Sequence, residues 1–440
     1  MEQLPRLLEK IEDLLRGHFD SSTSLLMIKW LAFFQLFAKA LLKGDEALIS
    51  QLKGEFDWSE FKTNEELMAL IRIFILENGD LNWFEDSFSE LSRLNNQELF
   101  EDIMSLIRKI PVETSTVEVY LQCLDVLATR DRFNYETPSS LSGLAKELLA
   151  HTSYDTLYDP AIGAGKLAYE VSLNHENVKI YGQDIHPMEL NICKMLLTLS
   201  GRINELSYLK EGHTITSPKH IEEGKVKTFD CVVSQPPFGL RDWGIEQILE
   251  DDRFHRGLPP KTHGDYAFIT QVVESINETG KGLMILLTGP LFREAREGEI
   301  RRQLIEENLV ETVISLPGNM LHGTALPVNI VIFNKQKSSP DIFFINATSF
   351  VTRKRTQSTL TESAIKEIAN LYHNHEEVEE ISRIVSIDEI KANRYNLMVE
   401  RYVTKKQVQE VFDLDALQKE HQTLMKDLEI LQTQLGDILS

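Results

Sequence analysis

The run Ser234-Gln235-Pro236-Pro237-Phe238-Gly239 carries the residue types best suited to chemistry, and it directly follows the apolar segment 229–233. Consecutive prolines make a rigid turn, because proline fixes φ and donates no hydrogen bond to a ladder. The Gln235 amide and the Pro236 carbonyl can accept hydrogen bonds from an exocyclic amine, while Phe238 offers a stacking face. The run therefore predicts a site for a flat ligand whose amino group is alkylated.

A glycine turn lies at a second expected strand end, in the run Asp159-Pro160-Ala161-Ile162-Gly163-Ala164-Gly165. Glycines permit positive φ and close approach of the backbone to a ligand, and the helix start that follows favours a carboxylate or a phosphate. The turn lacks the Gly-Lys-Ser/Thr ending of a P-loop and the third glycine of the full dinucleotide pattern. Alone, it is a weak indication of a nucleotide-like ligand.

Asp184 ends the next expected strand, about 20 residues after the glycine turn. A carboxylate at that place can accept hydrogen bonds from both hydroxyls of a ribose. Taken singly, Asp184 fits a helix cap equally well, and the preceding glycine turn favours the ribose interpretation. Upstream, Thr137 and Pro138 precede an amphipathic helix expected over 142–149, where an ordinary helix start explains them too.

The expected elements divide the chain into three parts. Apolar residues at helical spacing, such as Leu4, Leu8 and Ile11, predict an all-helical N-terminal domain over 1–128. Short apolar runs that alternate with helical segments predict an α/β domain with a largely parallel sheet over 129–403. Spacings of three and four residues predict a heptad helix over 404–440. The expected strands are 156–158, 178–182, 229–233, 282–287, 310–316, 328–334 and 341–346, and the heptad positions are Leu414, Leu417, His421, Leu424, Leu428, Leu431, Leu435 and Ile438.

Charge and composition restrict the function. The 440 residues carry a formal net charge of −22, which excludes a protein that grips nucleic acid over its whole surface. A nucleic-acid enzyme of this charge needs a local basic cleft or a basic partner. The densest basic groups, at 353–355 and 293–302, are interpreted as solvated faces.

The remaining composition indicates a globular cytoplasmic chain. No run of about 18 apolar residues and no signal peptide is found, so we expect no contact with a membrane. Cys123, Cys193 and Cys231 stand singly among apolar neighbours. We therefore expect reduced core cysteines, without disulfides and without a metal site.

The order of the motifs resembles a known family. The patterns Tyr135-x-Thr137-Pro138, Asp159-Pro160-x-x-Gly163-x-Gly165, Gly182-x-Asp184 and Pro236-Pro237-Phe238-Gly239 follow one another as in the S-adenosylmethionine-dependent N6-adenine DNA methyltransferases, in particular the modification subunits of type I restriction–modification systems. The segments Gly264-Asp265-Tyr266-Ala267-Phe268 and Asn393-Arg394-Tyr395-Asn396-Leu397 extend the resemblance over residues 130–403.

The resemblance implies a Rossmann-like α/β methyltransferase core between an all-helical N-terminal domain and a C-terminal coiled-coil helix. It implies S-adenosylmethionine as the cofactor, no metal, and methyl transfer to adenine N6 in a specific DNA site. By the same resemblance, the catalytic residues are Gln235, Pro236, Pro237 and Phe238, and the cofactor-binding residues are Tyr135, Thr137, Pro138, Asp159, Pro160, Gly163, Gly165, Asp184 and His213.

Two positions depart from the family pattern. Gln235 replaces an asparagine, and His213 occupies a place where such enzymes often have an acid near the cofactor's adenine. One extra methylene moves the Gln235 amide by about 1.5 Å. The alternative is therefore a catalytically weak scaffold that binds S-adenosylmethionine and DNA. An amino-methyltransferase acting on protein glutamine or RNA has a similar turn, but the helical N-terminal domain and the heptads fit it poorly.

Two features of the sequence indicate the expected partners: no segment looks like a target-recognition domain, and the C-terminal segment has a heptad repeat. No segment resembles a dedicated target-recognition domain, so the resemblance implies double-stranded DNA reached through a DNA-specificity subunit. It also implies a second copy of this chain in the complex, and it leaves open a restriction subunit. The heptad stripe has to be buried. Helices of the specificity subunit are the preferred cover, and this chain's own helical domain is the alternative.

Overall fold

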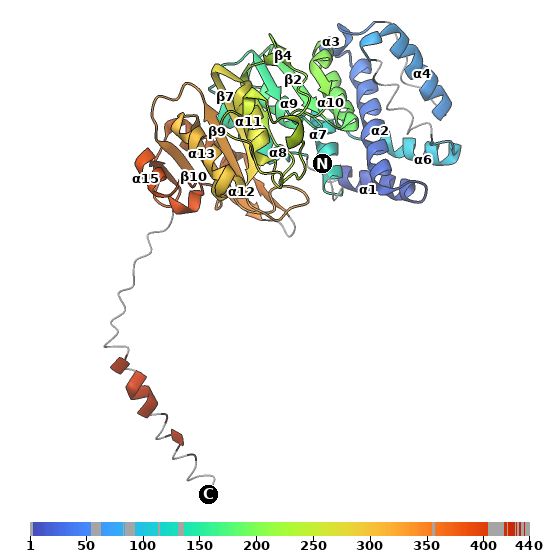
Figure 1. The fold of residues 1–440 in the computed structure, drawn as a ribbon. Coiled ribbons are helices and arrows are strands. Elements are labelled where there is room, and N and C mark those ends of the chain that lie inside the picture. Colours follow the sequence, from blue (N-terminus) through green and yellow to red (C-terminus); the bar gives the residue numbers. More distant parts are fainter. Residues whose placement is uncertain are drawn as a thin grey trace. The chain divides into compact units, whose positions relative to one another are not determined.

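The computed structural model describes residues 3–53, 63–81, 83, 93–112, 115–130, 136–353 and 357–403, together with positions 418, 419, 421–426, 428, 431, 432 and 435. The chain separates into two compact units, Met1–Val403 and Thr404–Ser440. Figure 1 shows the first unit with its helices in blue and cyan beside a sheet drawn in green to orange. The first unit thus contains both the helical part and the sheet.

The described residues before residue 130 are largely helical, as the apolar spacing predicts. The first helix buries the predicted stripe of Leu4, Leu8, Ile11 and Leu15. The second begins after Asp20, whose carboxylate accepts a hydrogen bond from the backbone N–H of Thr23 and so satisfies one free donor of the first turn. The elements of this part are α1 (Gln3–Arg16), α2 (Ser21–Leu42), α3 (Glu46–Ile49), α4 (Asn64–Glu77), η1 (Gly79–Leu81), α6 (Gln97–Ile107) and α7 (Thr116–Ala128).

Helix α2 corrects one expectation from the sequence. By length and composition it is apolar enough to cross a membrane, although no such segment was expected. In the fold, 72% of its most apolar window is buried, and the helix packs against α1 and α7. A helix that is apolar on all sides is typical of a protein core as well as of a membrane span. Burial within the helical part accounts for the composition of α2.

Among the described residues, nine strands form one mixed sheet in the order β13-β10-β8-β9-β7-β6-β1-β2-β3. Strands β1, β2, β3, β6, β7, β8 and β10 run in one direction, and β9 and β13 run antiparallel to their neighbours. The predicted, largely parallel sheet is therefore confirmed, and its two antiparallel strands make it a mixed sheet. The strands are β1 (Thr156–Asp159), β2 (Lys179–Asp184), β3 (Leu209–Glu211), β6 (Phe229–Ser234), β7 (Ile276–Leu287), β8 (Val310–Leu316), β9 (Val328–Asn334), β10 (Ile342–Asn346) and β13 (Ser382–Val385).

All seven expected strands are present, and the unexpected ones are short. Strand β3 has three residues and β13 has four. Two small antiparallel pairs, β4 (Ile221–Glu222) with β5 (Lys225–Val226) and β11 (Val351–Arg353) with β12 (Ser358–Leu360), were not expected either. Segments of two to four residues are too short for an alternation to be recognised.

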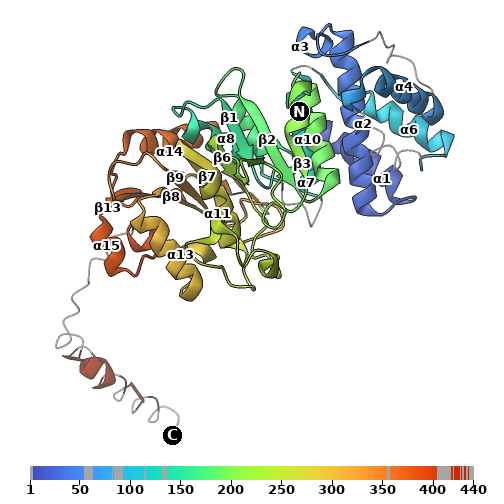
Figure 2. The same cartoon turned by 45° about the horizontal axis from the view of Figure 1, so that its top comes forward.

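The two faces of the sheet carry two cores. In β6, Cys231 and Val233 belong to one core and Val232 to the other. Helices α8 (Ser139–Leu149), α9 (Lys166–Ser172), α10 (Pro187–Leu199) and α14 (Glu362–Asn374) contribute to the first core, and α11 (Asp265–Ser275) and α13 (Ala295–Glu306) to the second. Figure 2 shows α11 and α13 on the near side of the strands. Because both faces are covered, the central strands are apolar throughout.

The order of the strands creates a switch point beside β1. The chain runs outward from β1 to β2 and β3, then returns to the opposite side of β1 as β6. In open α/β sheets, ligands bind outside the carboxyl ends of the strands at such a reversal. The remaining short elements are α12 (Gly289–Phe292), α15 (Ile387–Ala392), η2 (Ile203–Tyr208), η3 (Ile245–Gln247), η4 (Asp252–Phe254) and η5 (Val399–Arg401).

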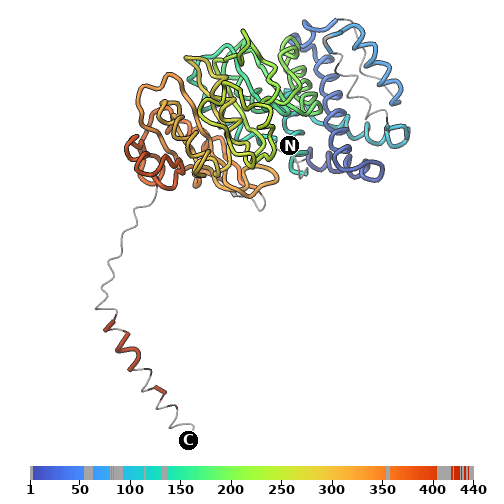
Figure 3. The backbone as a smooth tube through the Cα atoms, in the orientation of Figure 1, coloured from blue at the N-terminus to red at the C-terminus, as the bar shows by residue number. Residues whose placement is uncertain are grey.

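The second unit is a helical segment at its described positions, as the heptad spacing predicts. Figure 3 draws the described positions of this unit in red. Leu424, Leu428, Leu431 and Leu435 are 49–61% exposed. The heptad positions Leu414, Leu417 and Ile438 lie outside the described residues. What covers the stripe stays a prediction.

Candidate active site

A cavity of about 670 Å³ lies at the switch point, at the carboxyl ends of β1, β2 and β6. It brings together residues from both predicted motifs, which are separated by about 70 positions in the chain. Tyr135 lies outside the described residues. The predicted residues that line the cavity are Thr137, Asp159, Pro160, Gly163, Gly165, Asp184, His213, Gln235 and Pro237, and those that do not are Pro138, Pro236 and Phe238.

The glycine turn after β1 has a conformation that other residues adopt at a cost. Gly163 and Gly165 have φ values of 51° and 80°. A Cβ at Gly163 meets nothing within 4 Å, whereas a Cβ at Gly165 collides with the Sγ of buried Cys193. Gly165 is thus required for both its backbone conformation and the close packing of α9 on α10. Its N–H donates to the carbonyl of Ile162 at 2.8 Å.

Asp184 fastens the glycine turn to the end of β2. One carboxylate oxygen, Oδ2, accepts a hydrogen bond from the N–H of Gly163 at 2.9 Å, and Oδ1 accepts one from the N–H of His186 at 2.9 Å. The capping role and the ribose role, which the sequence left as alternatives, are compatible. Each carboxylate oxygen can accept a further hydrogen bond from a ligand.

Asp159, the last residue of β1, is 2% exposed. Its Oδ1 accepts a hydrogen bond from the N–H of Ala161 at 2.9 Å. Burial raises the pKa of Asp159 to about 7, and the negative charge of Asp184 contributes in the same direction. A carboxyl group with this pKa changes its charge near neutral pH, and a bound cation favours its ionised form.

His213 lies in the loop after β3 and faces the cavity. Its Nδ1 accepts hydrogen bonds from the N–H groups of Ile215 at 3.3 Å and Thr216 at 3.4 Å. The ring proton of neutral His213 is thereby assigned to Nε2, which can donate to a ligand. Burial lowers the pKa of His213, so the ring is neutral at pH 7.

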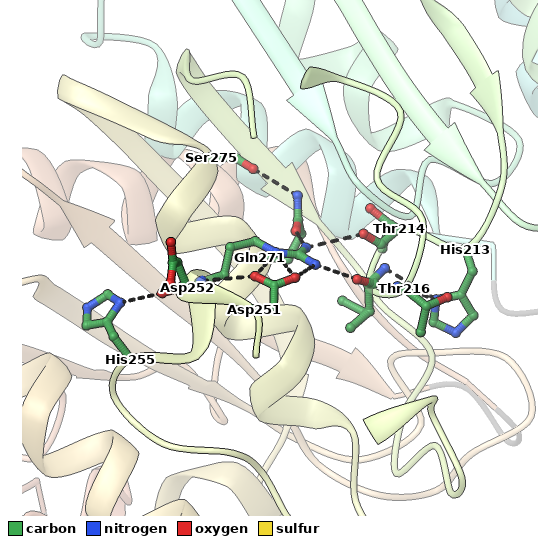
Figure 4. A network of polar contacts seen from close by, with 10 residues as sticks. His213, Thr214, Thr216, Asp251, Asp252, His255, Gln271 and Ser275 are labelled. Atoms are coloured by element: carbon green, nitrogen blue, oxygen red, sulfur yellow. Dashed lines mark hydrogen bonds and ion pairs between the residues drawn. The ribbon is translucent and has the colours of Figure 1, made fainter. Parts of the chain in front are cut away.

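Arg253 anchors the His213 loop, and no motif in the sequence indicated this role. The side chain is 7% exposed and forms an ion pair with Asp251 at 2.5 Å. Its Nη2 donates to the carbonyl of Ile215 at 2.5 Å, and its Nη1 donates to Gln271 of α11. Figure 4 shows Asp251 and Gln271 next to each other, with Thr214 of the His213 loop on one side of them. A distant arginine thus sets the position of this cavity wall.

The turn after β6 is held by the first residue of α11. Gln235 is 8% exposed and lines the cavity. The N–H of Gly239 donates to Oδ1 of Asp265 at 3.1 Å, and Oδ2 of Asp265 pairs with Arg293 at 2.5 Å. Phe238 is half-buried and packs against the first core.

Two other aromatic residues line the cavity where a stacking ring was expected from Phe238. They are Trp243 and Phe268, which are 1% and 4% exposed. The indole N–H of Trp243 donates to the carbonyl of Pro260 at 3.0 Å. Phe268 belongs to the Gly-Asp-Tyr-Ala-Phe motif noted in the sequence, but its place at the cavity depends on how α11 packs.

The helical part also contributes to the cavity. Nζ of Lys29 in α2 pairs with Glu136 at 2.6 Å, and both side chains are almost completely buried. Glu136 lines the cavity next to Thr137. Lys166 at the start of α9 pairs with Asp125 of α7. Two ion pairs therefore join the helical part to the walls of the site, and in the first of them both partners are buried.

Comparison with known proteins agrees with this geometry. Residues 116–411, about two thirds of the chain, match the family model described as N-6 DNA Methylase. The chain is 26% identical over 319 residues to the type I restriction enzyme MpnII methylase subunit of Mycoplasma pneumoniae, covering 69% of this chain and 59% of the relative. It is 28% identical over 396 residues to the MjaIX methylase subunit of Methanocaldococcus jannaschii, covering 83% and 67%. The chain thus spans about two thirds or less of the length of these two relatives.

Solved structures show the same fold. The methyltransferase subunit of a type I restriction-modification system from Streptococcus thermophilus superposes with a TM-score of 0.71 at 22% identity, covering 91% of this chain and 99% of that one. A modification subunit of a putative type I restriction enzyme from Vibrio vulnificus gives 0.66 at 15% identity, covering 88% and 93%. The family match spans the helix before the glycine turn, the whole cavity and the end of the first unit. Because it covers about two thirds of the chain, the chain belongs to the N-6 DNA methylase family.

Proposed function

We propose that this chain transfers a methyl group from S-adenosylmethionine to adenine N6 in DNA, as the modification subunit of a type I restriction–modification complex. The observation that carries the proposal is the meeting of two motifs in one cavity. The glycine turn with Asp184 and the turn with Gln235 line the same space of about 670 Å³. A methyltransferase needs its two substrates side by side, and this cavity offers a place for each.

The residues of the cavity fit S-adenosylmethionine. Asp184 can accept hydrogen bonds from the ribose hydroxyls, and Nε2 of His213 can donate to a ring nitrogen of the adenine. Asp159 places a carboxyl group at the start of the glycine turn, where its ionised form suits the cationic amino group. When bound, S-adenosylmethionine supplies an activated methyl group on a sulfonium.

The residues of the β6 turn have the task of presenting the target amine. The Gln235 side chain lines the cavity and can accept a hydrogen bond from N6, which withdraws positive charge as the new bond forms. The rings of Trp243 and Phe268 offer apolar walls to a base taken out of the duplex. Positioning is the main requirement, because the reaction needs little acid–base chemistry.

The partners proposed for this chain follow from the same family. The methylase subunits named above belong to type I restriction enzymes. We infer that DNA specificity comes from a separate subunit and that two copies of this chain flank it. The exposed leucines at 424, 428, 431 and 435 support an assembly role for the terminal helix, since an isolated amphipathic helix of this length is marginal in water.

The test separates cofactor binding from methyl transfer. The full chain, co-purified with its specificity subunit, is titrated with S-adenosylmethionine by calorimetry and then incubated with tritiated cofactor and unmethylated duplex DNA. We expect binding and the appearance of labelled N6-methyladenine. Asp184→Ala should weaken binding by about 1.5–3 kcal/mol. Gln235→Ala should leave binding unchanged and abolish transfer.

The same results distinguish the proposed methyltransferase from the alternative, a scaffold subunit without activity. Binding of the cofactor and of DNA without any label in adenine would identify a scaffold subunit, in which Gln235 has replaced the functional amide. Absence of cofactor binding in the folded chain would refute the proposed methyltransferase itself.

A further inference from the structure

A second cavity lies outside the site already described. It has a volume of about 240 Å³ and is formed by the segment after α12 and by residues 392–401. We call it the arginine cavity, because Arg301, Arg394 and Arg401 line it against a single acidic residue, Glu294. Three positive charges against one negative charge leave an excess of two. In a chain with a net charge of −22, such a local excess is unusual.

Arg301 forms the buried wall of the arginine cavity. Its side chain is only 2% exposed, which corrects the interpretation of residues 293–302 as a solvated basic face. Its guanidinium donates to three carbonyl oxygens, those of Tyr395 at 2.7 Å, Pro290 at 3.0 Å and Arg293 at 2.8 Å. Within the described part of the chain, no carboxylate forms an ion pair with Arg301. A buried cation without a counter-charge is costly, and an anion in the cavity would supply that charge.

The rim of the cavity offers further donors. Among the residues that the structure describes, Arg394 forms an ion pair only with Glu294, at 3.6 Å, and both side chains are about three quarters or more exposed. Exposed pairs of this kind contribute little stability, so Arg394 can exchange Glu294 for a ligand. The side-chain oxygen of Asn396 accepts a hydrogen bond from the N–H of Met398 at 2.9 Å, so its NH₂ group is oriented as a donor.

Part of the lining of the arginine cavity follows the carboxyl end of β7, at the same edge of the sheet as the methylation site. Strand β7 runs parallel to β6, and the segment 292–294 follows its carboxyl end. A chain of contacts connects the two places. Gly239 of the β6 turn donates to Asp265, Asp265 pairs with Arg293, and the carbonyl of Arg293 accepts from Arg301.

We propose that the arginine cavity binds a phosphate of the DNA backbone while the target base occupies the methylation site. The inference rests on the proposed function, because it takes the substrate to be DNA. Fixed arginines are suited to phosphate oxygens, which their planar donors meet two at a time. Phosphate contacts of this kind set the register of the duplex and carry no sequence information.

The experiment measures how DNA affinity depends on salt. A short fluorescein-labelled duplex of arbitrary sequence is titrated with the full chain, co-purified with its specificity subunit and saturated with S-adenosylmethionine, at several KCl concentrations. Each phosphate contact contributes about −0.9 to the slope of log K against log[salt]. Arg394→Gln and Arg401→Gln should each make the slope shallower by about 1 and weaken binding several-fold at low salt. The variant Arg302→Gln is the matched control, because Arg302 follows Arg301 on α13 but pairs with Glu299 and Glu306.

Three outcomes decide the proposal. Shallower slopes in both cavity variants, with Arg302→Gln unchanged, support it. Slopes equal to that of the wild-type chain, or a wild-type chain that binds no duplex, overturn it. A last outcome would also overturn it. If inorganic phosphate stabilises the wild-type chain against heat but does not stabilise the two variants, and the salt slopes for DNA are unchanged, the cavity is a site for free phosphate.

Failure of this proposal and failure of the proposed function can be told apart. Calorimetry with S-adenosylmethionine should give the same affinity for all three variants and the wild-type chain, because none of these arginines lines the methylation site. A chain that binds cofactor and methylates adenine but shows unchanged slopes refutes only the phosphate site. A chain that shows the expected slopes without methyl transfer refutes the proposed reaction.

Discussion

The cavity at the switch point has two walls, the glycine-turn side proposed for the cofactor and the Gln235 side proposed for the target base, and they are built in different ways. On the cofactor side, the contacts that shape the turn join residues close in sequence or on adjacent strands, such as Asp159 with Ala161 and Asp184 with Gly163. On the substrate side, the turn with Gln235 is held by Asp265, 30 positions away. The glycine turn of the cofactor side is therefore held by the ends of its own two strands, and the turn of the substrate side depends on how α11 packs against the sheet.

The difference explains where a departure from the family pattern can be tolerated. The cofactor wall retains its glycines and both acids, each with a backbone partner. On the substrate wall, the replacement at Gln235 can be accommodated by small movements of a turn whose anchor lies elsewhere. Changes to the cofactor wall should thus act on stability or affinity, and changes to the substrate wall should act on the rate of transfer.

The largest expected effect concerns Asp159 and pH. The pKa of Asp159 in the folded chain is about 7, well above its ordinary value near 4. The unfolded chain therefore loses this proton at lower pH than the folded chain, and folding is penalised as pH rises from about 4 to 7. Three pKa units correspond to about 4 kcal/mol. Relative to the wild-type chain without ligand, Asp159→Asn should gain up to that amount of stability above pH 7 and nothing below pH 4.

Urea unfolding of both proteins across this pH range measures the difference. The same variant should bind S-adenosylmethionine more weakly at pH 8, because the cationic ligand loses an ionised partner. A stability difference that does not change with pH would show that Asp159 is ionised throughout, and the account of the cofactor wall would need revision.

The next effect compares the two glycines of the turn. Gly165→Ala should destabilise the folded chain by about 3 kcal/mol, since the new methyl group meets Cys193 and the backbone has positive φ. Gly163→Ala is the control, because its Cβ has free space and only the cost of about 1 kcal/mol for the left-handed conformation applies. Chemical denaturation measures both. Equal losses would mean that packing against Cys193 is not what requires Gly165.

The third prediction tests the distant anchor of the substrate wall. Asp265→Ala removes the acceptor for the N–H of Gly239 and one partner of Arg293, which keeps Glu297. A displaced turn should slow methyl transfer on the order of 100-fold. The affinity for S-adenosylmethionine should stay unchanged. Asp265→Asn keeps the acceptor and should recover much of the rate, whereas an equal loss of cofactor affinity in both variants would show that the two walls are not independent.

The sequence predicted what is local and missed what is not. The strand ends, the glycine turn and Asp184 were recognised because each motif spans a few consecutive residues with a characteristic pattern. Arg253, Trp243 and the anchor Asp265 were missed as parts of the site, since nothing in their neighbours indicates which loop they will meet. The burial of Arg301 was missed for the same reason: a basic run looks solvated until its helix is packed.

The smallest expected effect is at Gln235, and it tests how far the substrate wall adapts. Its side chain is almost completely buried at the cavity, so the amide cannot simply swing into solvent. Gln235→Asn shortens the side chain by one methylene and moves the amide back by about 1.5 Å. If the glutamine amide is misplaced by about 1 Å, the rate can fall by about 100-fold. Because the turn is anchored at a distance, it can move and correct part of this misplacement. We therefore expect Gln235→Asn to raise the rate of transfer by about 10-fold. Single-turnover methylation measures this change, with cofactor affinity unchanged. If Gln235→Asn instead abolishes transfer in a folded complex, the cavity is built around glutamine, and the substrate wall is as rigid as the cofactor wall.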